Sequence, residues 1–176
     1  MFVAAMPSQG GLINTIALAV QYDRALQDPN EDSTTGLWDR LLNNNFGGDN
    51  WIVTPQKRQT SGARPDFVIE RFWSNSAFIE VIVVEAKPQH QTMSQDSYTD
   101  EQVLGYAINA LETGQAKGQM KIFALRVVGT RMMAYKVTRA NQVLTPLASD
   151  YMDPKVNEAA MRQVFDMIKN ANVLAP

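Results

Sequence analysis

The chain contains no cysteine and a single histidine, His90. Without cysteine, neither a disulfide framework nor a thiolate metal site can form, which excludes zinc fingers and iron–sulfur centres. Long hydrophobic runs are also missing, because Asn14 and Thr15 interrupt the apolar stretch from Leu12 to Val20, and the first residues include no basic segment. We therefore expect no membrane span and no signal peptide, and an intracellular location in the cytoplasm or nucleus.

An excess of basic residues is absent as well. Sixteen Lys and Arg against eighteen Asp and Glu give a formal net charge of −2, which argues against a protein that coats nucleic acid through bulk positive charge. Any nucleic-acid contact must then come from a local basic patch. The length of 176 residues, with 45% hydrophobic and 19% charged residues, is typical of one globular domain. We expect residues 1–176 to form that single domain.

Hydrophobic periodicity predicts four helices and five strands. The helices are expected over residues 11–27, about 36–45 with Ser33 or Thr34 as its cap, 100–111 and 154–170. The strands are expected over residues 51–53, 67–69, 78–84, 121–128 and 132–137, with a hairpin turn at 74–76 and Pro88 ending the third strand. This order predicts an α/β fold in which helices flank a mixed sheet.

Acidic residues lie at one end of two expected strands. Asp66 leads into the strand at 67–69, and Glu85-Ala86-Lys87 follows the strand at 78–84. Because side chains alternate along a strand, Glu85 and Lys87 should point to the same side of the sheet. An antiparallel hairpin would then bring Asp66 beside Glu85. Two carboxylates and an ammonium at one place suit a hard divalent cation and a phosphate group.

These motifs and the element order resemble the PD-(D/E)xK nuclease superfamily over roughly residues 10–138. The resemblance implies a restriction-endonuclease-like mixed β-sheet flanked by helices, with an αβββαβ core. It implies that Asp66, Glu85 and the backbone carbonyl of Ala86 bind Mg²⁺ or Mn²⁺, while Lys87 orients the water and the phosphate. A metal-dependent nuclease follows from it, and we favour DNA over RNA as the substrate.

A third motif lies on the expected helix 100–111, where Gln102 and Tyr106 are four residues apart and share a face. It resembles the Q-x-x-x-Y of RecB-like branches, in which both side chains touch the phosphate or DNA beside the metal. Packing is the alternative role for Tyr106. Three basic residues that precede Asp66 are candidates for phosphate contacts: Lys57, Arg58 and Arg64.

Other acids are less easily assigned. Many superfamily members carry a metal-binding Glu on the first helix, whereas residues 11–27 contain only Asp23. Glu31, Asp32 and Asp39 are rival candidates, so this ligand stays unassigned. Strand alternation places Glu80 on the side opposite Glu85, where it should pair with a base or lie at a covered edge. Glu70 shares the strand parity of Asp66 and could support the metal, but we favour a rim charge, and we expect His90 to be an exposed loop residue.

Two other functions remain open. A catalytically inactive module of the same fold that binds nucleic acid or a protein partner is consistent with the acidic net charge and the missing helix acid. A structural subunit of a larger assembly is the third possibility. Metal binding distinguishes the first two, and an exposed apolar patch would favour the third.

Overall fold

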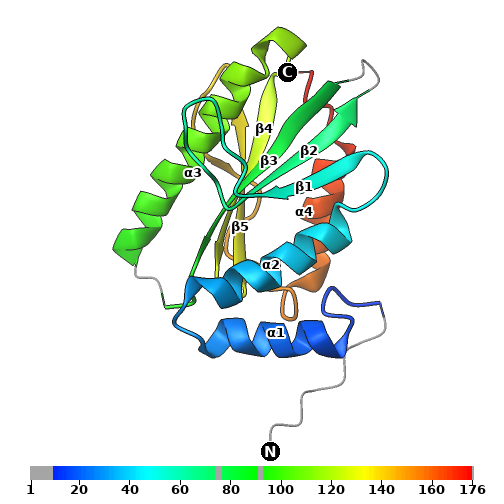
Figure 1. Cartoon of the computed structure of the whole chain (residues 1–176), viewed down its shortest axis with the longest axis vertical. Helices are drawn as coiled ribbons and strands as arrows, with labels where there is room; N and C mark the ends of the chain where they lie inside the picture. Colours follow the sequence, from blue (N-terminus) through cyan, green and yellow to red (C-terminus); the bar gives the residue numbers. More distant parts are fainter. Residues whose placement is uncertain (1–9, 74–76, 91–92, 176) are drawn as a thin grey trace, which may run out of the picture.

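The central feature is a six-stranded mixed β-sheet with the strand order β1-β2-β3-β4-β5-β6 (Figure 1). The structure is a computed structural model that describes residues 10–73, 77–90 and 93–175. The strands are β1 (Trp51–Pro55), β2 (Phe67–Trp73), β3 (Ala77–Lys87), β4 (Lys121–Val128), β5 (Arg131–Thr138) and β6 (Thr145–Pro146). Only β3 and β4 pair in parallel; the other neighbours are antiparallel. The expected α/β fold is therefore confirmed.

Helices cover both faces of this sheet (Figure 1). Helix α3 (Met93–Thr113) packs on one face, where Val68 and Val83 meet Val103 and Ala107. The other face packs against α1 (Ile16–Gln27), α2 (Glu31–Asn45) and α4 (Glu158–Asn170). From α2 to β4 the elements follow the order α, β, β, β, α, β that the sequence predicted.

A β-bulge interrupts the pairing of β2 with β3. Ile69 pairs with Ile82, but the next residue, Glu70, pairs with Glu80, so Val81 is an additional residue on β3. Val81 and Ile82 consequently both contribute to the core on the face covered by α1, α2 and α4. A bulge of this kind shifts the alternation of side chains on one side of it. The expectation that Glu80 and Glu85 lie on opposite sides of the sheet is wrong for this reason.

The predicted N-terminal boundaries of all four helices were wrong. Helix α1 begins at Ile16 rather than residue 11, because the Thr15 hydroxyl caps it by accepting the Leu18 N–H at 3.2 Å. Helix α2 begins at Glu31 rather than about residue 36, so Ser33 and Thr34 lie inside the helix and do not cap it. Helix α3 begins at Met93 rather than residue 100.

Helix α4 starts at Glu158 instead of residue 154, because turns occupy the preceding residues. Short additions to the expected elements are β6 and the 3₁₀ helix η1 (Gln115–Lys117). The predicted strand 121–128 is confirmed at both ends, and β3 ends at Lys87 immediately before Pro88. The expected turn at 74–76 lies outside the described residues. In the described part of the chain, no helix has the length and apolar character needed to cross a membrane.

Candidate functional site

Asp66 and Glu85 lie side by side where β2 begins and β3 ends. Phe67 pairs with Val84, so the residues just outside that pair, Asp66 and Glu85, are neighbours across the two strands. Both carboxylates are buried, with 8% and 5% of their surface exposed. Each acid therefore feels the negative charge of the other at short range, as the hairpin argument from the sequence required.

Two hydrogen-bond donors hold the Asp66 carboxylate, one on each of its oxygens. Its Oδ2 accepts the backbone N–H of Ala86 at 2.7 Å, and its Oδ1 accepts the side-chain amide of Gln56 at 2.8 Å. Since a carboxylate has about four acceptor positions, two of them stay open for another ligand. The carboxylate is thus oriented without being saturated.

Lys87 occupies the space between two glutamates. Its ammonium lies 2.6 Å from Oε1 of Glu85 and 3.7 Å from Oε2 of Glu31. Glu31 is the first residue of α2, where the helix dipole favours a carboxylate. The structure therefore brings Glu31 to the site among the rival helix acids, while Asp32 and Asp39 are exposed.

The pKa values at this site reflect burial of like charges. Burial raises the pKa of Glu85 from 4.5 to about 7, with Asp66 and Glu31 adding to the rise and Lys87 opposing it. Burial also raises the pKa of Glu31. Burial disfavours the charged form of Lys87, but the hydrogen bond to Glu85 and the surrounding negative charges raise its pKa overall. Carboxylates in this setting gain from any additional positive charge.

The donor chemistry fits a hard cation, although the carboxylates are not preassembled around one. Among residues 10–73, 77–90 and 93–175, no three His, Cys, Asp or Glu side chains already form a group that could hold a metal ion. The available oxygen donors are the Asp66 and Glu85 carboxylates, with Glu31 on the far side of Lys87. Mg²⁺ and Mn²⁺ prefer oxygen ligands of this kind, and Mg²⁺ is usually bound through only one or two carboxylates.

Tyr106 reaches the same site from α3. Burial raises its pKa to about 12, and the charges of Glu85 and Asp66 and a hydrogen bond with Glu85 add to the rise. Gln102, one turn earlier, has a buried Oε1 atom with no hydrogen-bond partner in the described structure. Both residues line an open groove of about 410 Å³ whose other lining residues are Ser61, Ala63, Glu101, Gly105, Ile108, Asn109 and Glu112. Tyr106 thus lies beside the two acids, and Gln102 lines the same groove as Tyr106.

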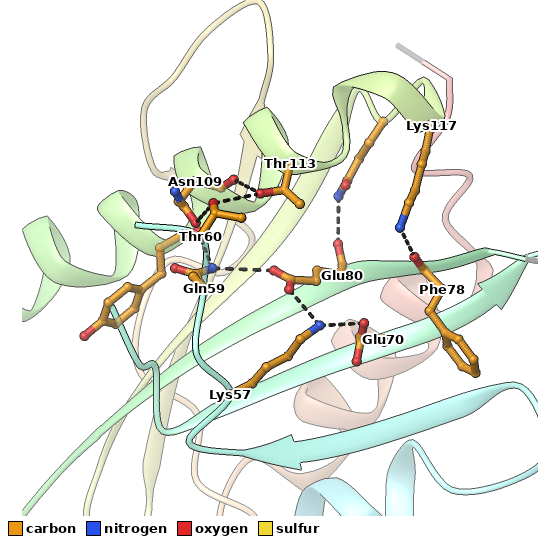
Figure 2. Close-up of polar contacts among 11 residues, drawn as sticks. Lys57, Gln59, Thr60, Glu70, Phe78, Glu80, Asn109, Thr113 and Lys117 are labelled. Carbon is orange, nitrogen blue, oxygen red and sulfur yellow. Dashed lines mark hydrogen bonds and ion pairs between the residues drawn. The ribbon is translucent and has the colours of Figure 1, made fainter. Parts of the chain in front are cut away.

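Lys57 lies in an internal ion-pair cluster (Figure 2). Its ammonium is 2.7 Å from Glu70 and 2.9 Å from Glu80. The base that was expected to pair with Glu80 is therefore Lys57. Glu70 binds the same ammonium and makes no contact with Asp66 or Glu85. Because two carboxylates already bind Lys57, a phosphate would have to compete with them. The ion pairs disfavour the phosphate contact that the sequence suggested for this residue.

The same cluster anchors the β1–β2 loop, residues 56–66, on α3. The Gln59 amide donates to the Tyr106 carbonyl at 3.0 Å and faces Glu80, and the Thr60 hydroxyl lies 3.3 Å from side-chain oxygens of Asn109 and Thr113 (Figure 2). This loop carries the other two basic candidates, Arg58 and Arg64. Both are exposed, and neither forms an ion pair with a described residue. They remain available for an anionic ligand.

Two residues of the site were not assigned from the sequence. Glu31 was one of several rivals, and only the early start of α2 places it next to Lys87. Gln56 was not considered, since an exposed glutamine in a polar loop has no distinctive sequence signal. His90 is exposed, as expected for a loop residue.

Comparison with known proteins gives a fold but no family. No protein-family model matches the chain, and no curated protein matches it in sequence. Among solved structures, the chain is similar to a chain in a cryo-EM structure of a DrdV–DNA complex, with a TM-score of 0.50 and 13% sequence identity. The likeness covers 90% of this chain but 14% of that chain, so this chain spans a small part of the other protein's length. At this identity, the likeness shows a shared fold.

Proposed function

We propose that this chain is a metal-dependent nuclease that hydrolyses phosphodiester bonds of nucleic acid, with DNA favoured over RNA. The observation that carries the proposal is the side-by-side placement of two buried carboxylates, Asp66 and Glu85, with the Lys87 ammonium 2.6 Å from Glu85. Burying like charges together costs free energy, which a binding site for a cation explains and a purely structural role does not. The fold shared with a protein solved in complex with DNA supports the choice of nucleic acid.

In this proposal Asp66, Glu85 and the Ala86 carbonyl hold Mg²⁺ or Mn²⁺, and Glu31 is the additional helix acid. A bound divalent cation would make a water molecule more acidic and offset negative charge on the phosphate. Lys87 would donate its ammonium to a phosphate oxygen, where it would offset negative charge. Tyr106, whose interaction with Glu85 contributes to its raised pKa, would help to orient that carboxylate.

Substrate binding falls to the exposed loop and the groove beside it. Arg58 and Arg64 would contact phosphates, which fix the position of a nucleic acid without reading its sequence. Gln102 would accept a hydrogen bond from a water molecule next to the scissile phosphate, since its Oε1 has no partner in the described structure. Because the formal net charge is −2, binding should be weak and should weaken further as the salt concentration rises.

Cleavage assays test the proposal. Single- and double-stranded DNA and RNA are incubated with the protein and Mg²⁺ or Mn²⁺, alongside Asp66→Asn, Lys87→Met and the control Asp39→Asn, an exposed acid on α2. We expect Asp66→Asn and Lys87→Met each to lower cleavage by about 100-fold or more, and the control to leave it unchanged. Cleavage that survives both substitutions would exclude this site as the catalytic centre.

A catalytically inactive nucleic-acid-binding or protein-binding module is the second candidate. It is favoured by the engagement of Lys87 with both Glu85 and Glu31, because this ammonium offsets part of their negative charge without a cation. Calorimetric titration with Mn²⁺ separates the two candidates. A ligand of the native state must raise the unfolding temperature, so the absence of both binding heat and a thermal shift would favour the inactive module.

A further inference from the structure

Gln56, the first residue of the β1–β2 loop that leads to Asp66, has an unusual backbone conformation. Its φ angle is 49°, and it is the only non-glycine residue with a positive φ among the residues that the structure describes. A side chain in this left-handed region costs free energy, which glycine would avoid. Such outliers persist where surrounding contacts compensate for them, and they are frequent at functional sites.

The backbone N–H and the side-chain amide of Gln56 both donate hydrogen bonds to Asp66. Its backbone N–H donates to the Asp66 carbonyl at 2.9 Å, and its side-chain amide donates to the Asp66 Oδ1 at 2.8 Å. The Gln56 residue is otherwise exposed, so core packing does not account for its conformation. The left-handed turn therefore has one evident effect, which is to direct the amide onto the carboxylate.

This contact determines how the Asp66 carboxylate is rotated. The second oxygen accepts the Ala86 N–H at 2.7 Å. One hydrogen bond leaves a carboxylate free to turn about its last side-chain bond, which has a broad torsional profile, whereas two donors on different oxygens hold it in one plane. With Gln56 in place, the open acceptor positions of Asp66 have a defined direction.

We propose that Gln56 is a positioning residue, which orients the Asp66 carboxylate for a divalent cation through its side-chain amide. The inference rests on the proposed function, because it concerns how the same site binds its metal. Residues that orient metal ligands usually affect metal affinity more than they affect folding. A glutamine that only shaped the loop would act through its backbone conformation, and its amide would be dispensable.

Two substitutions separate the amide from the backbone. Gln56→Gly removes the amide and relieves the left-handed strain, whereas Gln56→Ala removes the amide and keeps the strain. Gln142→Gly, at an exposed glutamine in the loop after β5, is the control. Titration of the full chain with MnCl₂ measures affinity, and thermal unfolding in EDTA measures stability in the absence of metal.

We expect both Gln56 variants to bind Mn²⁺ about tenfold more weakly than the wild type, and the control to bind normally. In EDTA, Gln56→Ala should unfold about 2–4 °C below Gln56→Gly, so affinity and stability would not change in parallel. Wild-type affinity in Gln56→Gly would overturn the inference alone, since it would show that loop shape suffices. A wild-type chain that binds no Mn²⁺ would overturn both the inference and the proposed function.

Discussion

Replacing Glu85 by glutamine should stabilise the metal-free protein at alkaline pH, which is the opposite of what most substitutions of buried residues do. Burial raises the pKa of Glu85 from 4.5 to about 7 in the folded state. A raised acid pKa means that the folded chain binds this proton more tightly than the unfolded chain. The contribution of this proton to the free energy of unfolding is fully present below pH 4.5 and is lost as the pH rises through about 7.

The rise from 4.5 to about 7 corresponds to about 3 kcal/mol of unfolding free energy lost by pH 8. Glu85→Gln removes this loss, because the amide is neutral at every pH and keeps an oxygen that can accept from Tyr106. Part of the gain is offset, since Lys87 loses its partner at 2.6 Å and retains only Glu31. A net stabilisation of about 1–3 kcal/mol at pH 8 is expected, and almost none at pH 5.

Urea unfolding in EDTA at pH 5, 6, 7 and 8 measures this difference. Glu112→Gln, at an exposed glutamate of α3, controls for removal of one negative charge. The wild-type curve should fall relative to that of Glu85→Gln as the pH rises above 4.5, and the difference should level off above about 7, the pKa of Glu85 in the folded chain. Equal destabilisation by Glu85→Gln at pH 5 and pH 8 would refute the reasoning, because it would show that the buried carboxylate carries no electrostatic cost.

Three further outcomes are expected. Mn²⁺ should raise the unfolding temperature more at pH 8 than at pH 6, because protons compete with the cation for Glu85; an equal shift at both values, measured by thermal unfolding, would contradict its role as a ligand. Lys57→Met should lower the free energy of unfolding, measured in urea, by about 1–3 kcal/mol, since Glu70 and Glu80 lose their common partner. It should leave the affinity for Mn²⁺ unchanged, and weaker Mn²⁺ binding would show that this cluster is not separate from the site. Trp38→Phe should cost about 1–3 kcal/mol in the same assay, because the buried indole N–H donates to the Gly129 carbonyl at 2.8 Å; a neutral result would mean that water replaces the donor.

Local patterns located five strands and the pair of acids, although β2 and β3 extend beyond their predicted ends at residues 69 and 84, and β6 was not predicted. The run from Lys121 to Val128 is rich in residues that favour strands, and its predicted limits agree with β4. The placement of Asp66 beside Glu85 followed from two rules, hairpin pairing and alternation, which act over a few residues. Interactions of this range are encoded by the neighbouring residues themselves.

These short-range rules did not predict where the helices begin or which side of the sheet Glu80 faces. The first turns of α2, from Glu31, bury the polar residues Ser33 and Thr34, which fall outside the apolar spacing that predicted the helix. The bulge at Val81 reversed the expected orientation of Glu80, and a single additional residue in a strand leaves no signal in a run of apolar residues.

The sequence by itself determined which residues meet at the candidate site, because the placement of Asp66, Glu85 and Lys87 depends on strand alternation and on one short hairpin. Only the tertiary structure decided which helix acid joins them, which base pairs with Glu80, and how Gln56 reaches Asp66. Those contacts join residues that are distant in the chain or lie across a loop. Their geometry is set by how the helices and the loop pack on the finished sheet, so periodicity along the chain cannot reveal it.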